Sequence, residues 1–144
     1  MGCTGSRIAL AATEAELQRI LMEVAFTRNY GFRLHSIGDG ECAITVPFQR
    51  AFERPGGVVS GQVFMAAADV AMWLAIMTKL GTAELAVTAE MKTNFLSGAR
   101  EEDFLCQAKI LKLGKRLVFG TAECVNGEGK LLTHHTITNV RTSS

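Results

Sequence analysis

The sequence lacks the features that mark several classes of protein. It has no basic tract, and its fifteen lysine and arginine side chains nearly balance fourteen aspartate and glutamate side chains, for a net charge of +1. Because a nucleic-acid-binding surface needs a basic patch, nothing in this composition indicates a nucleic-acid partner. The four cysteines form no C-x-x-C pair and no regular spacing. Free thiols in a reducing compartment are the simpler interpretation.

Segments directed to a membrane are also scarce. The first ten residues contain no apolar run after a basic residue, so we expect no secretory signal, a soluble protein and a cytoplasmic location. The longest nearly apolar stretch, residues 63–77, is short for a bilayer span and carries Asp69. The opening Met-Gly-Cys-Thr-Gly-Ser fits a myristoylation pattern, with Cys3 as a candidate palmitoylation site, but such short patterns recur by chance.

What is present is a chain of 144 residues, 48% of them hydrophobic, which is enough for one globular domain with a buried core. Thr13 followed by Glu16 forms a capping-box pattern and predicts a short helix at the start of that domain. We therefore assign residues 13–141 to a single domain. Residues 1–12 are expected to form a flexible N-terminal segment.

A long central helix is predicted over residues 60–80. Ser60 is a favourable N-cap, and Gly81 is placed to end the helix. The sequence GQVFMAAADVAMWLAIMTKL is apolar on nearly every side, which is typical of a buried helix. A sheet must therefore surround it.

Strands are predicted on both sides of this helix, at residues 30–35, 41–48, 85–95, 104–113, 117–125 and 130–140. Within residues 85–95 the odd positions are mostly apolar, and the even positions from Thr88 onward, including Glu90, are polar. One face of that strand should be buried and the other available to water or a partner. The predicted fold class is α+β, with a curved antiparallel sheet around one long helix and a short helix at the N-terminus.

Asp69 is the candidate for chemistry. It is the only ionisable residue between Arg54 and Lys79, and no side chain three or four residues away can pair with a carboxylate. Burial without a partner would be unfavourable or would protonate the group. Asp69 therefore either receives a partner from elsewhere or lines a cleft that uses a carboxylate. A purely structural role, in which it accepts a hydrogen bond from a strand residue such as Thr88, stays open.

The start of the central helix is the second candidate. Gly57, Ser60 and Gly61 allow a ligand to approach the backbone closely. The amides of Gly61 and Gln62 lie at the positive end of the helix dipole, where they can bind a developing oxyanion. Taken alone, the same residues also fit an ordinary N-cap.

These residues resemble a motif of the hotdog thioesterases of the phenylacetate-degradation type. The family has Asn-x-x-Gly-x-x-His-Gly-Gly and, nine residues after the histidine, an Asp or Glu. At the five defined positions of this motif, the chain has Arg54, Gly57, Ser60, Gly61 and Gln62. Asp69 is in register, and the Gly-Gly-x-x-Ser-Gly variant of a subgroup matches residues 56–61. The segment AVTAEMKTNFLSGA resembles the family's second active-site strand, with Thr88 at the place of a water-positioning Ser or Thr.

The resemblance implies the hotdog fold and hydrolysis of acyl-coenzyme A thioesters by a homodimer or homotetramer with sites at the subunit interface. Asp69 would be the general base or the nucleophile, the Gly61 amide would bind the thioester oxygen, and Thr88 would hold the water. The substrate-binding residues would be Arg54, Gly57, Ser60 and Gln62. No cofactor is implied.

Two alternatives remain. Arg54 and Ser60 replace the family's Asn and His, so the chain could instead be a non-catalytic protein that binds or senses acyl-coenzyme A. A hydratase or dehydratase of the same fold would need a histidine near the central helix, and none lies between His35 and His134. No metal site is expected, because His134 and its neighbour in the chain would point to opposite faces of a strand.

Geometry adds a prediction about assembly. Gly61 and Asp69 are eight residues apart, about 12 Å along a helix, whereas two groups that act on one carbonyl must both lie within about 3–4 Å of it. One chain therefore cannot supply both groups to one site, and a symmetric dimer with two sites is predicted. Lys115 and Arg116, at a hairpin, could contact the phosphates of coenzyme A or could simply be a solvated turn.

Overall fold

The structure is a computed structural model that describes residues 9–142. Its elements, in chain order, are α1 (Glu14–Glu23), α2 (Ala25–Tyr30), β1 (Arg33–Gly38), β2 (Glu41–Val46), the 3-10 helix η2 (Arg50–Phe52), β3 (Glu53–Arg54), β4 (Val58–Val59), α3 (Gly61–Leu80), β5 (Ala86–Phe95), β6 (Phe104–Leu113), β7 (Leu117–Asn126) and β8 (Leu131–Arg141).

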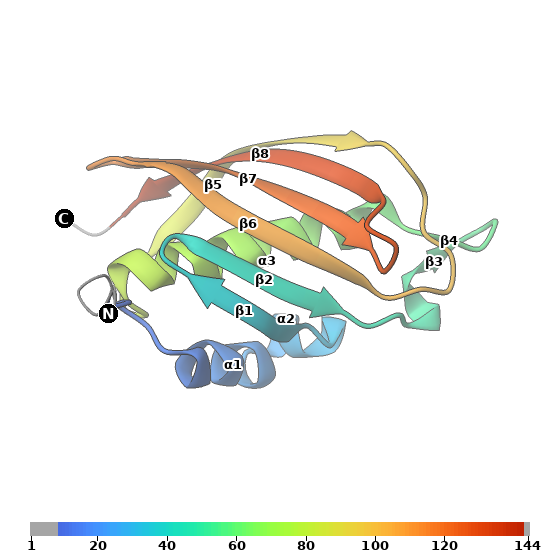
Figure 1. Cartoon of the computed structure of the whole chain (residues 1–144), viewed down its shortest axis with the longest axis horizontal. Helices are drawn as coiled ribbons and strands as arrows, with labels where there is room; N and C mark the ends of the chain where they lie inside the picture. The colour runs from blue at the N-terminus through green and yellow to red at the C-terminus, as the bar shows by residue number, and fades with distance from the viewer. Residues whose placement is uncertain (1–8, 143–144) are drawn as a thin grey trace, which may run out of the picture.

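One antiparallel sheet curves around the long helix α3 (Figure 1). Its strand order in the described part of the chain is β1-β2-β6-β7-β8-β5, while β3 and β4 form a separate small hairpin. The apolar side chains of α3 pack against the inward side chains of the strands and form the core. The predicted fold, a hotdog-type sheet wrapped around one central helix, is confirmed.

Both predicted helix starts are confirmed by their caps. The Thr13 hydroxyl accepts the Glu16 amide at 3.1 Å, and the Glu16 carboxylate accepts the Thr13 amide at 2.9 Å. The Ser60 hydroxyl accepts the Gln62 amide at 3.3 Å, and Gly81 ends α3 with a φ of 88°. By length and composition α3 could also cross a membrane, but most of it is buried within its own chain, as a core helix is.

The N-terminal segment is only partly described. The Ala11 amide donates to the Thr78 carbonyl at 2.8 Å, and Ala12 is buried. These two residues of the predicted flexible segment therefore contact the domain. The lipidation pattern at residues 1–6 lies outside the described residues.

Residues 25–30 form a helix that the sequence did not predict. The predicted strand from residue 30 instead begins at Arg33. Gly31, with a φ of 74°, ends α2, and the buried Thr27 hydroxyl bonds the Val24 carbonyl at 2.9 Å. The helix places the ring of Phe26 beside that of Trp73 on α3.

A bulge interrupts β5 at Ala89. Thr88 pairs with Asn139 and Glu90 pairs with Thr138, so Ala89 is the extra residue of β5. A bulge reverses the side-chain alternation, and Thr88 therefore faces α3 as the buried Asn139 does, while Glu90 faces outward. The predicted placement of Thr88 and Glu90 on one polar face is wrong for this reason.

The apolar face predicted for β5 is not buried within one chain. β5 is an edge of the sheet. Leu85, Val87 and Phe95 are 69%, 54% and 57% exposed. An edge strand with exposed apolar side chains is a surface that other chains can pair with.

Candidate active site

The central helix presents one stripe of side chains that its own sheet does not cover. Gln62 and Met65 are exposed, and Asp69 and Trp73 are half-buried. Their spacing of three to four residues places them on one side of α3. Asp69 is therefore a carboxylate on an open side of an otherwise buried helix.

Asp69 has the strand partner that the sequence suggested. The Thr88 hydroxyl donates to Asp69 Oδ1 at 2.5 Å. Thr88 in turn accepts from Asn139 Nδ2 at 3.4 Å. Asn139 is 4% exposed. It could not be identified from the sequence, because its place beside Thr88, 51 residues away, depends on the pairing of β5 with β8.

These three polar groups line a pocket of about 350 Å³. Its other lining residues are Phe26, Val70, Trp73, Ala86 and Val87. The rings of Phe26 and Trp73 have centroids 6.1 Å apart. The pocket therefore combines a cluster of hydrogen-bonding groups with apolar walls, an arrangement typical of small-molecule sites.

A second pocket, of about 440 Å³, lies at the start of α3 and is lined by Arg54, Val58, Val59, Gly61, Phe64, Phe95, Leu96, Ser97 and Gly98. A Cβ atom at Gly61 would lie only 2.9 Å from Cε1 of Phe95, so this position requires glycine unless the ring moves. Ser60 caps the amide of Gln62, but no acceptor within residues 9–142 takes the Gly61 amide. That amide is available to a ligand at the positive end of the helix.

Two guanidinium groups flank this second pocket. Arg54 lines it, and Arg100 Nη1 donates to the Gly56 carbonyl at 2.6 Å and lies 3.2 Å from the Cβ position of Gly57. Gly57 has a φ of 78°, which favours glycine. Arg100 was not among the predicted residues, although it follows directly after the segment that resembles the family's second active-site strand.

The two pockets are separate within one chain. The residues around Asp69 and those around Gly61 do not overlap. The structure thus brings Asp69 together with Thr88, and Gly61 together with Arg54, but it does not join the two groups.

Lys115 and Arg116 lie far from Gly61 of their own chain. They are exposed at the turn between β6 and β7, where the Arg116 carbonyl accepts the Arg141 amide at 2.7 Å. Figure 1 shows this turn at the opposite end of α3 from β3 and β4. Within one chain, neither of these cations lines the pocket at Gly61.

The inward cysteines and His135 form part of the core. Burial raises the pKa of the Cys42 thiol to about 12. A hydrogen bond between the Cys106 and Cys124 thiols raises the pKa of Cys106 and lowers that of Cys124. Both His135 ring nitrogens have hydroxyl partners at 2.8 Å. Among residues 9–142 no group of three His, Cys, Asp or Glu side chains could hold a metal ion.

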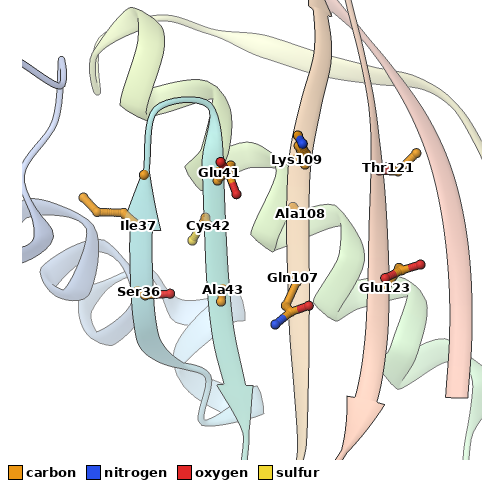
Figure 2. A pocket seen from close by; sticks show the side chains of 11 residues that line it. Ser36, Ile37, Glu41, Cys42, Ala43, Gln107, Ala108, Lys109, Thr121 and Glu123 are labelled. Carbon is orange, nitrogen blue, oxygen red and sulfur yellow. The ribbon is translucent and has the colours of Figure 1, made fainter. Parts of the chain in front are cut away.

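A pocket of about 430 Å³ also lies on the sheet face away from α3 (Figure 2). Strands β1, β2, β6 and β7 contribute polar side chains, among them Ser36, Glu41, Gln107, Lys109 and Glu123. None of the predicted site residues lines it. We assign it no role in the site.

Comparison with known proteins identifies relatives of this chain. The family model of the thioesterase superfamily matches residues 56–133, more than half of the chain. A candidate esterase of Saccharolobus solfataricus is 33% identical over 92 residues, which are 64% of this chain and 65% of that protein. The chain thus spans just under two thirds of that relative's length.

Solved structures share the architecture. A candidate thioesterase from Silicibacter sp. has a TM-score of 0.83 at 29% identity and covers 93% of this chain and 94% of that chain. A protein of the E. coli phenylacetic acid degradation operon has a TM-score of 0.80 at 17% identity, covering 88% and 90%. A hypothetical thioesterase from Streptococcus pneumoniae, solved with coenzyme A, has a TM-score of 0.72 at 16% identity, covering 78% and 87%. At such low identities the last two likenesses show the fold alone.

Proposed function

The chain belongs to the thioesterase superfamily, and from that premise we propose that it hydrolyses acyl-coenzyme A thioesters to a carboxylic acid and coenzyme A. Hydrolysis of an ester or thioester is the activity that family membership supports. The choice of acyl-coenzyme A rests on the site. The observation that carries it is a positioned carboxylate, Asp69, at an accessible pocket with apolar walls large enough for an acyl group.

Asp69 is the base or the nucleophile in this proposal. In the first route its carboxylate removes a proton from water while the water oxygen attacks the thioester carbonyl. In the second route Asp69 attacks directly and forms an anhydride that water then hydrolyses. In either route the carbon–sulfur bond breaks and the thiolate of coenzyme A leaves and takes up a proton. The hydrogen bond from Thr88 holds one carboxylate oxygen in place and leaves the other for the reaction.

The Gly61 amide serves as the oxyanion hole. As the thioester carbonyl becomes tetrahedral its oxygen gains negative charge, and an uncommitted amide at a helix start stabilises that charge. Since Gly61 and Asp69 line different pockets of one chain, each site takes Gly61 from one subunit and Asp69 from another. The exposed apolar edge at β5 is the surface that we propose pairs with a second copy.

Coenzyme A would extend from this interface. Its phosphates are anions, and arginine is a favourable partner for them. Arg54 provides such charge in the Gly61 pocket, and Arg100 provides it at the neighbouring turn, where it contacts Gly56. The distant Streptococcus pneumoniae thioesterase, solved with coenzyme A, makes this ligand a reasonable choice. The buried free thiols support our proposal of a cytoplasmic location.

The test is a panel of acyl-coenzyme A substrates of differing chain length, with and without aromatic groups, assayed for release of free thiol. We expect turnover with at least one of them. If the protein binds the panel, seen as a raised melting temperature, but releases no thiol, it is the alternative acyl-coenzyme A-binding protein.

A further inference from the structure

We propose that Asn139 is a positioning residue of this active site that acts on Asp69 through Thr88. The inference rests on the proposed hydrolytic function and names a residue that the site motif does not contain. Three observations carry it. Asn139 lines the same pocket as Asp69 and Thr88, its Nδ2 donates to the Thr88 hydroxyl, and its Oδ1 is buried with no partner among residues 9–142.

The direction of the hydrogen bonds follows from counting protons. The Thr88 hydroxyl has one proton, which it donates to Asp69 Oδ1. Toward Asn139, the Thr88 hydroxyl oxygen can therefore only accept a hydrogen bond. A rotated Asn139 amide would place two acceptors against each other, so Nδ2 must face Thr88. The bond from Asn139, at 3.4 Å, is long, but it favours the rotamer in which Thr88 points its proton at the carboxylate.

The unpaired Oδ1 indicates that Asn139 is not placed for stability. A buried carbonyl oxygen without a donor is unfavourable, and an apolar side chain of the same size would avoid that penalty. Buried groups that violate hydrogen-bonding rules cluster at functional sites, where the arrangement serves the reaction. Here the arrangement fixes Asp69 Oδ1 and leaves Oδ2 directed at the substrate.

A double-mutant cycle tests the proposal. Asn139→Leu alone should lower kcat about 5- to 10-fold with KM nearly unchanged, and should keep or raise the melting temperature. Thr88→Val should also lower kcat. Because Asn139 acts through Thr88, Asn139→Leu should cause no further loss in the Thr88→Val background. Thr138→Val is the matched control, because this hydroxyl lies next to Asn139 in β8 but pairs with the outward Glu90.

Losses that multiply in the double mutant would overturn the proposal, as would an Asn139→Leu protein that melts earlier yet turns over normally. The same set of mutants can also be compared without an activity assay, through the ¹³C chemical shift of the Asp69 carboxyl carbon. Asn139→Leu should change that shift in the wild-type background and leave it unchanged in the Thr88→Val background. This readout separates failure of the positioning role from failure of the proposed function, which the acyl-coenzyme A panel tests on the wild type.

Discussion

Gly61 and Asp69 stand eight residues apart on α3 and line different pockets of the same chain. The α-helical rise puts about 12 Å between their positions along the axis. A carbonyl that accepts a hydrogen bond from one cannot be attacked by the other in the same subunit. A symmetric dimer resolves this, because a two-fold axis creates two equivalent sites, each with one residue from either chain.

Subunit complementation tests this arrangement directly. Gly61→Val, whose side chain would collide with the Phe95 ring, and Asp69→Asn should each be nearly inactive as homodimers. In a heterodimer of the two, one site carries both substitutions and the other carries neither. Separately tagged, co-purified heterodimers should therefore show about half of the wild-type kcat per dimer. No recovered activity would mean that both residues act within a single chain.

The β5 edge should be needed for both assembly and turnover. Leu85 is 69% exposed just before β5, so Leu85→Arg would place a charge in the proposed interface and favour dissociation. We expect light scattering to show a lower mass and the thioesterase assay to show a matching loss of activity. Met22→Arg is the matched control, because Met22 is also exposed but lies on α1. A fully active Leu85→Arg monomer would contradict the shared site.

The parts of the fold that local chemistry specifies could be predicted from the sequence. Thr13, Ser60 and Gly81 mark helix ends through their own side chains or backbone conformation, and the apolar surface of α3 predicts its burial. Helix α2 could not be predicted in the same way. Its N-cap is Val24, which makes no side-chain capping bond.

The candidate site was predictable only in part. Asp69 is conspicuous as the only acidic residue of the apolar helix α3, and Gly61 is conspicuous by its motif. The bulge at Ala89 cannot be recognised in the alternation of residues 85–95. The prediction that the Thr88 side chain lies on the same face as Glu90 was therefore wrong, although its contact with Asp69 was predicted as one alternative. Asn139 and Arg100 come to the site through long-range pairing and loop packing, which no local pattern in their own segments encodes.

Arg54 in β3 and Arg100 in the segment between β5 and β6 should bind the nucleotide part of acyl-coenzyme A. Replacing Arg54 and Arg100 together with alanine should raise KM for acyl-coenzyme A on the order of 10-fold, because charge-assisted hydrogen bonds to phosphate are lost. KM for N-acetylcysteamine thioesters, which lack the nucleotide, should stay unchanged. Equal changes for both substrates would show that the arginines support the pocket and do not bind phosphate.

Lys115 and Arg116 can be tested with the same two substrates. Their double alanine variant carries the same loss of charge at the other end of α3. A rise in KM that is specific to acyl-coenzyme A would mean that the hairpin reaches the phosphates, which is one of the two alternatives that the sequence left open. Unchanged KM values for both substrates would identify the hairpin as a solvated turn.

Asp69→Asn decides between an enzyme, a binding protein and a structural carboxylate. An asparagine keeps the size of Asp69 and can still accept from Thr88, but it can act neither as base nor as nucleophile. In an enzyme, kcat should therefore fall by a factor on the order of 10² or more, with the melting temperature held or raised. Glu128→Gln, which neutralises an exposed carboxylate in the turn between β7 and β8, should leave both unchanged. A binding protein would show no turnover even as wild type, yet acyl-coenzyme A would raise its melting temperature. An Asp69→Asn protein that melts earlier but hydrolyses at nearly the wild-type rate would assign Asp69 to the structure and remove it from the reaction.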